Sequence, residues 1–264
     1  MSGFSAEWLA LREPADTAAR SRALVAFVVS GPERAVPHWH GRLIDLGGGT
    51  GANIRYLASR LPSPQDWLLV DNDSALLARA PAGVATRCAD LNAVVDDGEL
   101  FRGAVLVTAS ALLDLVSEAW LAKLIARCRA ADAAVLFALN YDGRIVCTPP
   151  EPEDDEVRQL VNRHQNTDKG FGPALGPDAA ARAAALLSAA GYKVKQEQSD
   201  WTLEPDTREL QRELVAGWAV AASGIAPEGR AAISGWRSRR LAHVDAGRSR
   251  VVVGHVDLAG ICRA

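Results

Sequence analysis

The residues with the clearest chemical potential are two acids and a run of glycines, all at the ends of apolar stretches. Residues 43–51 read Leu-Ile-Asp-Leu-Gly-Gly-Gly-Thr-Gly, so an apolar stretch that holds Asp45 breaks into glycines. Glycines accept positive φ angles and let the backbone approach a ligand that a Cβ atom would keep away. A second apolar stretch, 67–70, ends at Asp71, where a carboxylate can accept hydrogen bonds from a ribose diol. This order of strand, glycine turn, helix, strand and acid predicts a nucleotide or nucleoside site.

Three kinds of ligand compete for the glycine turn. The phosphate loop of nucleoside triphosphatases is excluded, because no Gly-Lys-Ser/Thr sequence follows the turn. A nicotinamide or flavin dinucleotide stays open, since Gly47-x-Gly49-x-x-Ala52 fits the Gly-x-Gly-x-x-Gly/Ala pattern. Asp45, two residues before the first glycine, favours a third ligand, because a carboxylate repels a pyrophosphate and suits an ammonium group. S-adenosylmethionine carries an amino acid moiety, a sulfonium and no phosphate.

At these residues the chain resembles the class I S-adenosylmethionine-dependent methyltransferase superfamily. The stretch from Ile44 to Gly51 is similar to the first motif of that superfamily at every glycine, and the resemblance covers about residues 40–140. It implies that Asp71 holds the ribose, that Asn72 and Asp90 lie near the adenine, and that residues 108–114 close over the cofactor. The implied cofactor-binding residues are Asp45, Gly47, Gly48, Gly49, Gly51, Asp71, Asn72, Asp90, Leu91 and Ser110. Simpler roles stay open, with Asp45 bonding the turn backbone and with Asp71 and Asp90 capping strand ends.

The elements that must position these residues alternate between strands and helices. Apolar runs predict strands at 42–46, 67–70, 84–89, 104–108, 133–139, 192–198 (open to extension as far as Leu203) and 250–258. Apolar residues at helical spacing predict helices at 5–11, 15–29, 52–61, 117–130, 178–190, 206–222 and 228–244, with Pro14 dividing the first two, and a further helix is expected to begin at 73–79. The fold class expected is α/β: a Rossmann-like, doubly wound, seven-stranded sheet, mostly parallel with an antiparallel last strand, and helices on both faces.

One domain is expected over residues 1–264. Its parts are an N-terminal helical cap (1–40), a cofactor-binding core (41–140), an insertion or lid (141–177), and C-terminal helices with the closing strands (178–264). The insertion is rich in proline, acids and glycine, and it is long for a connection in a compact domain. Such insertions are often functional.

Methyl transfer needs the acceptor and the methyl group held in line, and a general base only if the acceptor arrives protonated. His164 and Asp114 are the candidate bases, although Asp114 is equally suited to capping the following helix. The candidate substrate-binding residues are Tyr141, Arg163, Asp168, Lys169 and Phe171. The alternative for this group is that it only anchors its loop. Three charged residues of the first helix are further candidates for the pocket wall, with solvated charge as the alternative: Arg12, Glu13 and Arg20.

The overall charge and one absent motif narrow the acceptor. The net charge of −3 argues against a dedicated nucleic-acid binder. Ser110-Ala-Leu-Leu stands where the superfamily places an Asn/Asp-Pro-Pro-aromatic motif for exocyclic base amines. We therefore expect a small-molecule acceptor and no nucleic acid, with methylation at oxygen favoured over nitrogen, carbon or sulfur. An NAD(P)-dependent oxidoreductase and a non-catalytic methyltransferase-like scaffold remain the alternatives.

The remaining features predict the setting of the protein. His38 and His40 have a metal-binding spacing, but no third ligand lies near them in the sequence, so no metal is expected. The four cysteines have no short paired spacing and suit reduced thiols. No signal segment and no stretch of about 20 apolar residues is visible. These features predict a cytoplasmic protein without membrane attachment, as a monomer or homodimer.

Overall fold

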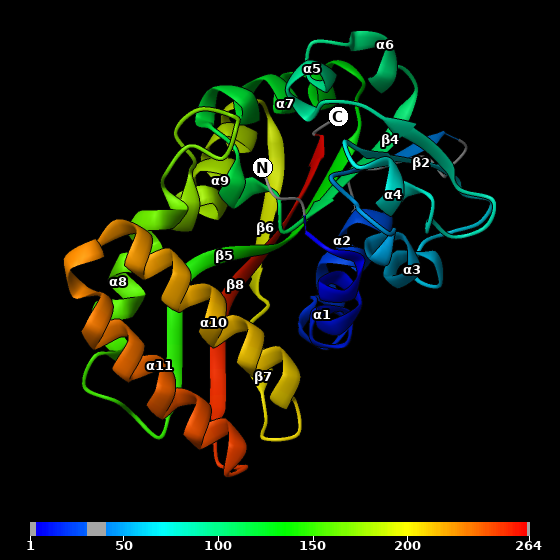
Figure 1. Cartoon of the computed structure of the whole chain (residues 1–264). Coiled ribbons are helices and arrows are strands. Elements are labelled where there is room, and N and C mark those ends of the chain that lie inside the picture. Colours follow the sequence, from blue (N-terminus) through cyan, green and yellow to red (C-terminus); the bar gives the residue numbers. More distant parts are fainter. Residues whose placement is uncertain (1–3, 31–40, 263–264) are drawn as a thin grey trace.

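A single mixed sheet forms the centre of the computed structural model, which describes residues 4–30 and 41–262. Its strand order is β3-β2-β1-β4-β5-β8-β6, and β7 also pairs with β8 (Figure 1). The strands are β1 (Arg42–Leu46), β2 (Asp66–Asp71), β3 (Ala85–Cys88), β4 (Ala104–Ser110), β5 (Ala134–Thr148), β6 (Tyr192–Gln198), β7 (Trp201–Leu203) and β8 (Arg250–Cys262). Strands β1 to β5 pair in parallel, whereas β8 is antiparallel to each of its neighbours. The predicted fold class is confirmed.

The described sheet has eight strands rather than the seven predicted. The difference arises because the predicted sixth strand is interrupted at Ser199 and Asp200, which separate β6 from β7. Asp200 accepts a hydrogen bond from the backbone nitrogen of His255 (3.1 Å) and binds Arg144 (2.7 Å). Its side chain therefore takes the place of a regular ladder contact at this point.

Helices cover both faces of the sheet, and the central strands are therefore buried on both sides. In β1, Ile44 and Leu46 belong to one hydrophobic cluster and Leu43 to another, as the two-residue period of a strand requires. The first cluster includes α5 (Leu91–Val94), α7 (Glu118–Ala130) and α9 (Ala179–Ala189). The second includes α2 (Arg22–Ser30), α3 (Ala52–Ala58) and α4 (Ser74–Leu77). The short α6 (Gly98–Phe101) leads into β4.

The amino-terminal helices divide at a different place from the one predicted. Helix α1 (Ala6–Ala19) runs through Pro14, and the break comes at Arg20 and Ser21. Pro14 is on the exposed side of the helix. The break has a specific cause, since the backbone nitrogen of Ser21 donates to Asp257 of β8 (3.0 Å) instead of continuing the helix. His38 and His40 lie outside the described residues.

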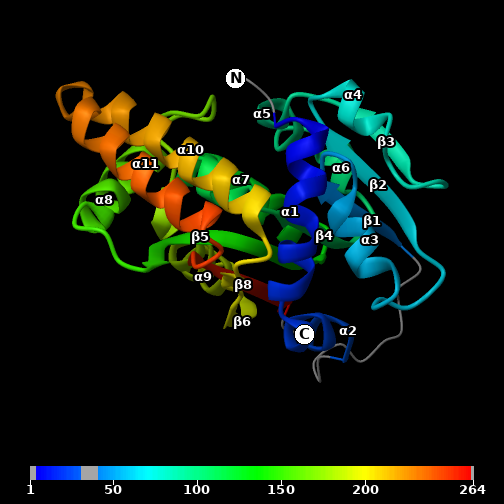
Figure 2. The same ribbon diagram turned by 60° about the horizontal axis from the view of Figure 1, so that its bottom comes forward.

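The segment predicted as an insertion, 141–177, is more regular than expected. Its first part completes β5, and residues 154–165 form α8 (Asp154–Gln165), with Val157, Leu160 and Val161 buried. Helix α8 packs with α10 (Arg208–Ile225) and α11 (Arg230–Asp245) over the far halves of β5 and β8 (Figure 2). No helix was expected from the sequence at 154–165, and one forms there because apolar residues spaced by three and four positions bury one helix face.

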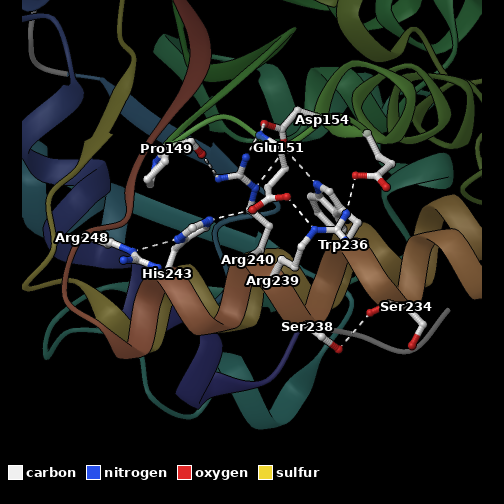
Figure 3. A network of polar contacts seen from close by, with 11 residues as sticks. Pro149, Glu151, Asp154, Ser234, Trp236, Ser238, Arg239, Arg240, His243 and Arg248 are labelled. Atoms are coloured by element: carbon white, nitrogen blue, oxygen red, sulfur yellow. Dashed lines mark hydrogen bonds and ion pairs between the residues drawn. The ribbon is translucent and has the colours of Figure 1, made fainter.

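A network of charged side chains fastens α11 to α8 and the segment before it (Figure 3). Arg240 is 1% exposed, binds Asp154 through two nitrogens and donates to the carbonyl oxygen of Pro149 (2.5 Å). Beside it, Arg239 and His243 both bind Glu151 (2.6 and 2.7 Å). These contacts hold α11 against the start of α8. No helix of the described residues is long and apolar enough to cross a membrane.

Candidate functional site

A cavity of about 460 Å³ lies between α1 and the carboxyl ends of β1, β2 and β4. Its volume is within the range of pockets that enclose a small-molecule ligand, roughly 300–1,000 Å³. Seven of the ten predicted cofactor residues line it: Gly47, Gly48, Gly49, Asp71, Asn72, Leu91 and Ser110. The cavity therefore lies beside most of the residues predicted to bind a cofactor, at the point where the strand order reverses between β1 and β4.

The glycine turn has the backbone conformation that its residues allow. Gly47, Gly49 and Gly51 all have positive φ angles, of 63°, 55° and 79°. A Cβ atom on Gly49 would lie 2.8 Å from Cδ1 of Leu9 in α1, and one on Gly48 would lie 2.3 Å from Oδ2 of Asp45. The turn is thus packed between Leu9 of α1 on one side and Asp45 on the other. Gly51 is the N-cap residue of α3 and does not line the cavity.

Asp71 is held firmly at the end of β2. The side chain is 8% exposed, Oδ2 accepts from the backbone nitrogen of Gly49 (2.8 Å), and Oδ1 accepts from that of Asp73 (3.0 Å). Each carboxylate oxygen has a second lone pair, so these bonds leave acceptor capacity for two ligand hydroxyls. Asp71 therefore caps the end of β2, the simpler role considered from the sequence, and it also lines the cavity, where its role in holding a ribose stays a prediction.

Asp45 lies under the turn and does not line the cavity. It is fully buried, and Oδ1 accepts from Nδ2 of Asn53 (2.5 Å) and from the hydroxyl of Thr108 (2.7 Å). Oδ2 has no hydrogen-bond partner among the described residues. Burial raises the pKa of Asp45 to about 6, against the opposing effect of the bonds from Thr108 and Asn53. In this structure Asp45 reaches the cavity through Asn53 rather than directly.

The positively charged side chain of Arg20 lies beside Asn53. The guanidinium of Arg20 lies 4.3 Å from the centre of the Tyr56 ring and donates to Oδ1 of Asn53 (2.5 Å). Arg20, Asn53 and Tyr56 all line the cavity, as do Arg12 and Glu13. Asn53 and Tyr56 were not singled out from the sequence. Their signal was their spacing of three in the helix directly after the turn, which directs both toward the strand ends.

Asp90 has a different position from the other predicted cofactor residues. It is exposed, it is absent from the cavity wall, and its Oδ1 accepts from the backbone nitrogen of Asn92 (2.9 Å) at the start of α5. Asp90 is therefore the N-cap of α5, whereas the roles considered from the sequence were contact with the adenine and capping of a strand end. Leu91, directly after it, is buried and lines the cavity.

Among the predicted substrate-binding residues, only Phe171 lines the cavity. Its ring makes an edge contact with Trp120, with the ring centres 5.7 Å apart. Asp168 accepts from the backbone nitrogens of Gly170 and Gly172 (2.6 and 3.0 Å), and Lys169 donates to the carbonyl oxygen of His164 (2.8 Å). Asp168 and Lys169 therefore anchor their own loop. Arg163 is exposed on α8.

Neither candidate base lines the cavity, and Tyr141 does not line it either. Asp114, in the 3-10 turn Leu113–Leu115, is 6% exposed, and its Oδ1 has no partner among the described residues. Burial raises the pKa of Asp114 to about 6, while the positive charges of Arg12 and Lys169 oppose the rise. Burial and the charge of Lys169 lower the pKa of His164. The hydroxyl of Tyr141 donates to Oδ1 of Asn162 (2.7 Å), and burial raises its pKa.

In the described part of the chain, no three histidine, cysteine, aspartate or glutamate side chains gather as a metal site.

Known proteins provide a comparison at the level of the fold. No protein-family model matches the chain, and no curated protein matches it significantly.

Solved structures do resemble it. A cyclopropane-fatty-acyl-phospholipid synthase-like protein from Lactobacillus casei has a TM-score of 0.54 at 13% identity, covering 97% of this chain and 94% of that one. A cyclopropane synthase from Mycobacterium tuberculosis has a TM-score of 0.49 at 12% identity, with the same two coverages. The first similarity shows that the chain shares the fold of that synthase-like protein over nearly its whole length.

Proposed function

We propose that the chain is an S-adenosylmethionine-dependent methyltransferase that acts on a small-molecule acceptor, with a hydroxyl oxygen as the favoured target. The observation that carries the proposal is the composition of one cavity. Its wall contains a tight glycine turn and Asp71, an acid at the end of β2 that could bind a ribose. It also contains Arg20 and Asn53, which could bind an amino acid moiety. The fold shared with the Lactobacillus casei protein supports it.

The charges around the cavity favour this cofactor over a dinucleotide. Four acids line the wall: Glu13, Asp16, Asp71 and Asp73. Arg12 is already paired with Asp16 (3.0 Å), and Arg20 is bonded to Asn53. The negative side chains around the cavity therefore outnumber the positive side chains that are free to bind a ligand. They would repel a pyrophosphate, whereas they would attract a ligand that carries an ammonium and a sulfonium. An NAD(P)-dependent oxidoreductase is the alternative that these charges disfavour.

When bound, S-adenosylmethionine supplies a methyl group on a sulfonium that leaves as a neutral thioether. The chain's own contribution is to bind and orient: Asp71 would hold the ribose, Asn72 and Leu91 would flank the adenine, and α1 would exclude water. Asp114 is the favoured base, because its buried Oδ1 has no partner among the described residues, because Leu112 and Leu115 beside it line the cavity, and because its pKa of about 6 leaves it ionised at pH 7. His164 is the second candidate.

The acceptor would contact the loop that holds Phe171 and the strand β5, which holds Tyr141. Phe171 offers an apolar surface, and Tyr141, Arg163, Asp168 and Lys169 are retained as candidate substrate contacts. A cytoplasmic location, and a monomeric or homodimeric state, likewise remain predictions from the sequence.

The first experiment measures binding of S-adenosylhomocysteine by calorimetry. Wild type should bind in the micromolar range, and Asp71→Ala should abolish detectable binding because the ribose hydroxyls and the amide of Gly49 lose their acceptor. Asp66→Ala is the matched control, since Asp66 is an exposed acid at the other end of β2. No binding by wild type, or equal binding by Asp71→Ala, would sink the proposal.

Turnover then separates an enzyme from a scaffold. A panel of hydroxyl- and amine-bearing metabolites with methyl-labelled cofactor should yield a labelled product, and Asp114→Asn should lower kcat on a hydroxyl acceptor. Binding without turnover on any acceptor would favour the non-catalytic scaffold. Quenching of nicotinamide fluorescence by wild type would favour the oxidoreductase.

A further inference from the structure

Asp257 of β8 joins two parts of the chain that are distant in sequence. Its side chain is 1% exposed, Oδ1 accepts from the backbone nitrogen of Leu139 (2.7 Å), and Oδ2 accepts from that of Ser21 (3.0 Å). These two amides lie 118 and 236 residues away along the chain. One carboxylate therefore ties the middle of β5 to the corner between α1 and α2.

The β5 side of this contact supports the cavity wall. Leu139 has a φ of 55°, a left-handed conformation that a residue with a Cβ atom rarely adopts. The pairing of β5 with β8 is irregular between Phe137 and Asn140, which leaves the amide of Leu139 free to bond Asp257. At the end of β4, Ala111 also has a positive φ and donates to the carbonyl oxygen of Ala138 (2.9 Å). Ala111 lines the cavity, so the irregular stretch of β5 lies directly behind the wall.

On the α1 side, the contact lies next to the positively charged side chain of Arg20. Ser21 directly follows Arg20, which lines the cavity. Burial lowers the pKa of Arg20, and among the neighbouring groups the negative charge of Asp257 opposes that change most strongly. Arg20 also donates to Asn53, which in turn binds Asp45 beneath the glycine turn. The position of Arg20 is thus fixed on one side by Asn53 and on the other by the corner that Asp257 holds.

We propose that Asp257 is a positioning residue for the cofactor, because it fixes the end of α1 and the charge of Arg20 against the cavity. The inference rests on the proposed cofactor. The two carboxylate oxygens of Asp257 each accept from one of the two amides, and the same side chain lies close enough to act on the buried Arg20. An asparagine offers one acceptor and one donor, so it would present an N–H group to one of the two amides.

The test compares four proteins by titration with S-adenosylhomocysteine: wild type, Asp257→Asn, Arg20→Met and the double variant. Asp257→Asn should raise Kd about 10-fold, and Arg20→Met at least as much. Because Asp257 acts through Arg20, the double variant should bind no more weakly than Arg20→Met alone. Effects that multiply, or an Asp257→Asn protein with wild-type Kd, would overturn the inference.

Asp200→Asn is the matched control for a merely structural loss. Asp200 also accepts a hydrogen bond from a backbone amide of β8, that of His255, but its other partner is Arg144 rather than a residue at the end of α1. Its variant should lose stability and keep wild-type Kd.

A measurement without ligand separates this inference from the proposed function. Amide hydrogen exchange across residues 6–21 should be faster in Asp257→Asn than in wild type and in Asp200→Asn. Should wild type fail to bind S-adenosylhomocysteine, the proposed function falls, and unchanged exchange would separately refute the role of Asp257 in holding α1.

Discussion

Replacing Asp45 with asparagine should stabilise the ligand-free protein at neutral pH. Asp45 is fully buried, and its Oδ2 has no partner among the described residues. Burial raises its pKa from 3.8 to about 6, so keeping the side chain ionised at pH 8 costs about 3 kcal/mol of folding free energy. Asparagine has the same shape, its oxygen can still accept from Asn53 and Thr108, and it carries no charge.

The sign of the effect follows from the direction of the pKa change. Between about pH 4 and pH 6 the folded state binds more protons at Asp45 than the unfolded state does, so the free energy of unfolding falls as pH rises through this window. Above about pH 7 both states are ionised and the contribution is constant. Asp45→Asn lacks this contribution. The variant should therefore match wild type near pH 4 and exceed it by up to about 3 kcal/mol at pH 8.

Urea denaturation at a series of pH values from 4 to 8 measures this difference directly. Asp114→Asn is the control, because burial raises the pKa of Asp114 to about 6 as well, away from the glycine turn. Both variants should show the pH-dependent gain, but only Asp45→Asn should bind S-adenosylhomocysteine more weakly, since it removes the charge expected to favour the ammonium. An Asp45→Asn protein that is less stable than wild type at pH 8, or a gain that is independent of pH, would refute the reasoning.

Two further substitutions test the cavity and the helical layer. Gly49→Ala should weaken S-adenosylhomocysteine binding at least 10-fold in calorimetry, because its Cβ would lie 2.8 Å from Leu9 at a φ of 55°. Gly83→Ala, at a φ of 81° with no described atom within 4 Å, should keep wild-type affinity and so isolate the close approach from backbone strain. Arg240→Met should lower the free energy of unfolding by about 3 kcal/mol in urea, since it leaves Asp154 without its buried partner. Arg239→Met, on an exposed side chain beside it, should leave the midpoint nearly unchanged, and equal losses in both variants would contradict the assignment of Arg240 as the buried anchor.

The parallel half of the fold was predictable because its signals are local. Strand β1 has the predicted bounds, and β2 and β4 each begin or end within two residues of theirs, since short apolar runs between turn residues define buried strands. The glycine turn and Asp71 came from the same signals. The cavity then adds residues such as Asn53, whose inward direction depends on how α3 packs.

The other half depends on long-range contacts that no single stretch of sequence reveals. Residues 140–148 continue β5 because β8 pairs with them, and the polar stretch around Glu153 starts a helix because α10 and α11 cover its apolar side. For the same reason α1 continues past Pro14 and stops at Arg20, where a carboxylate from β8 takes the next amide. Local propensity is a weak prior at such positions, and tertiary contacts override it.

The place of β8 in the sheet sets an order of assembly during synthesis. Among the described strands, β6 and β7 pair only with β8, so neither can join the sheet until residues 250–262 have left the ribosome. Until then the nascent chain presents the open edge of β5, a surface that attracts other strands or chaperones. The same strand carries Asp257, which fixes the end of α1. The wall of the cavity that is translated first is thus locked in place by a residue translated nearly 240 positions later.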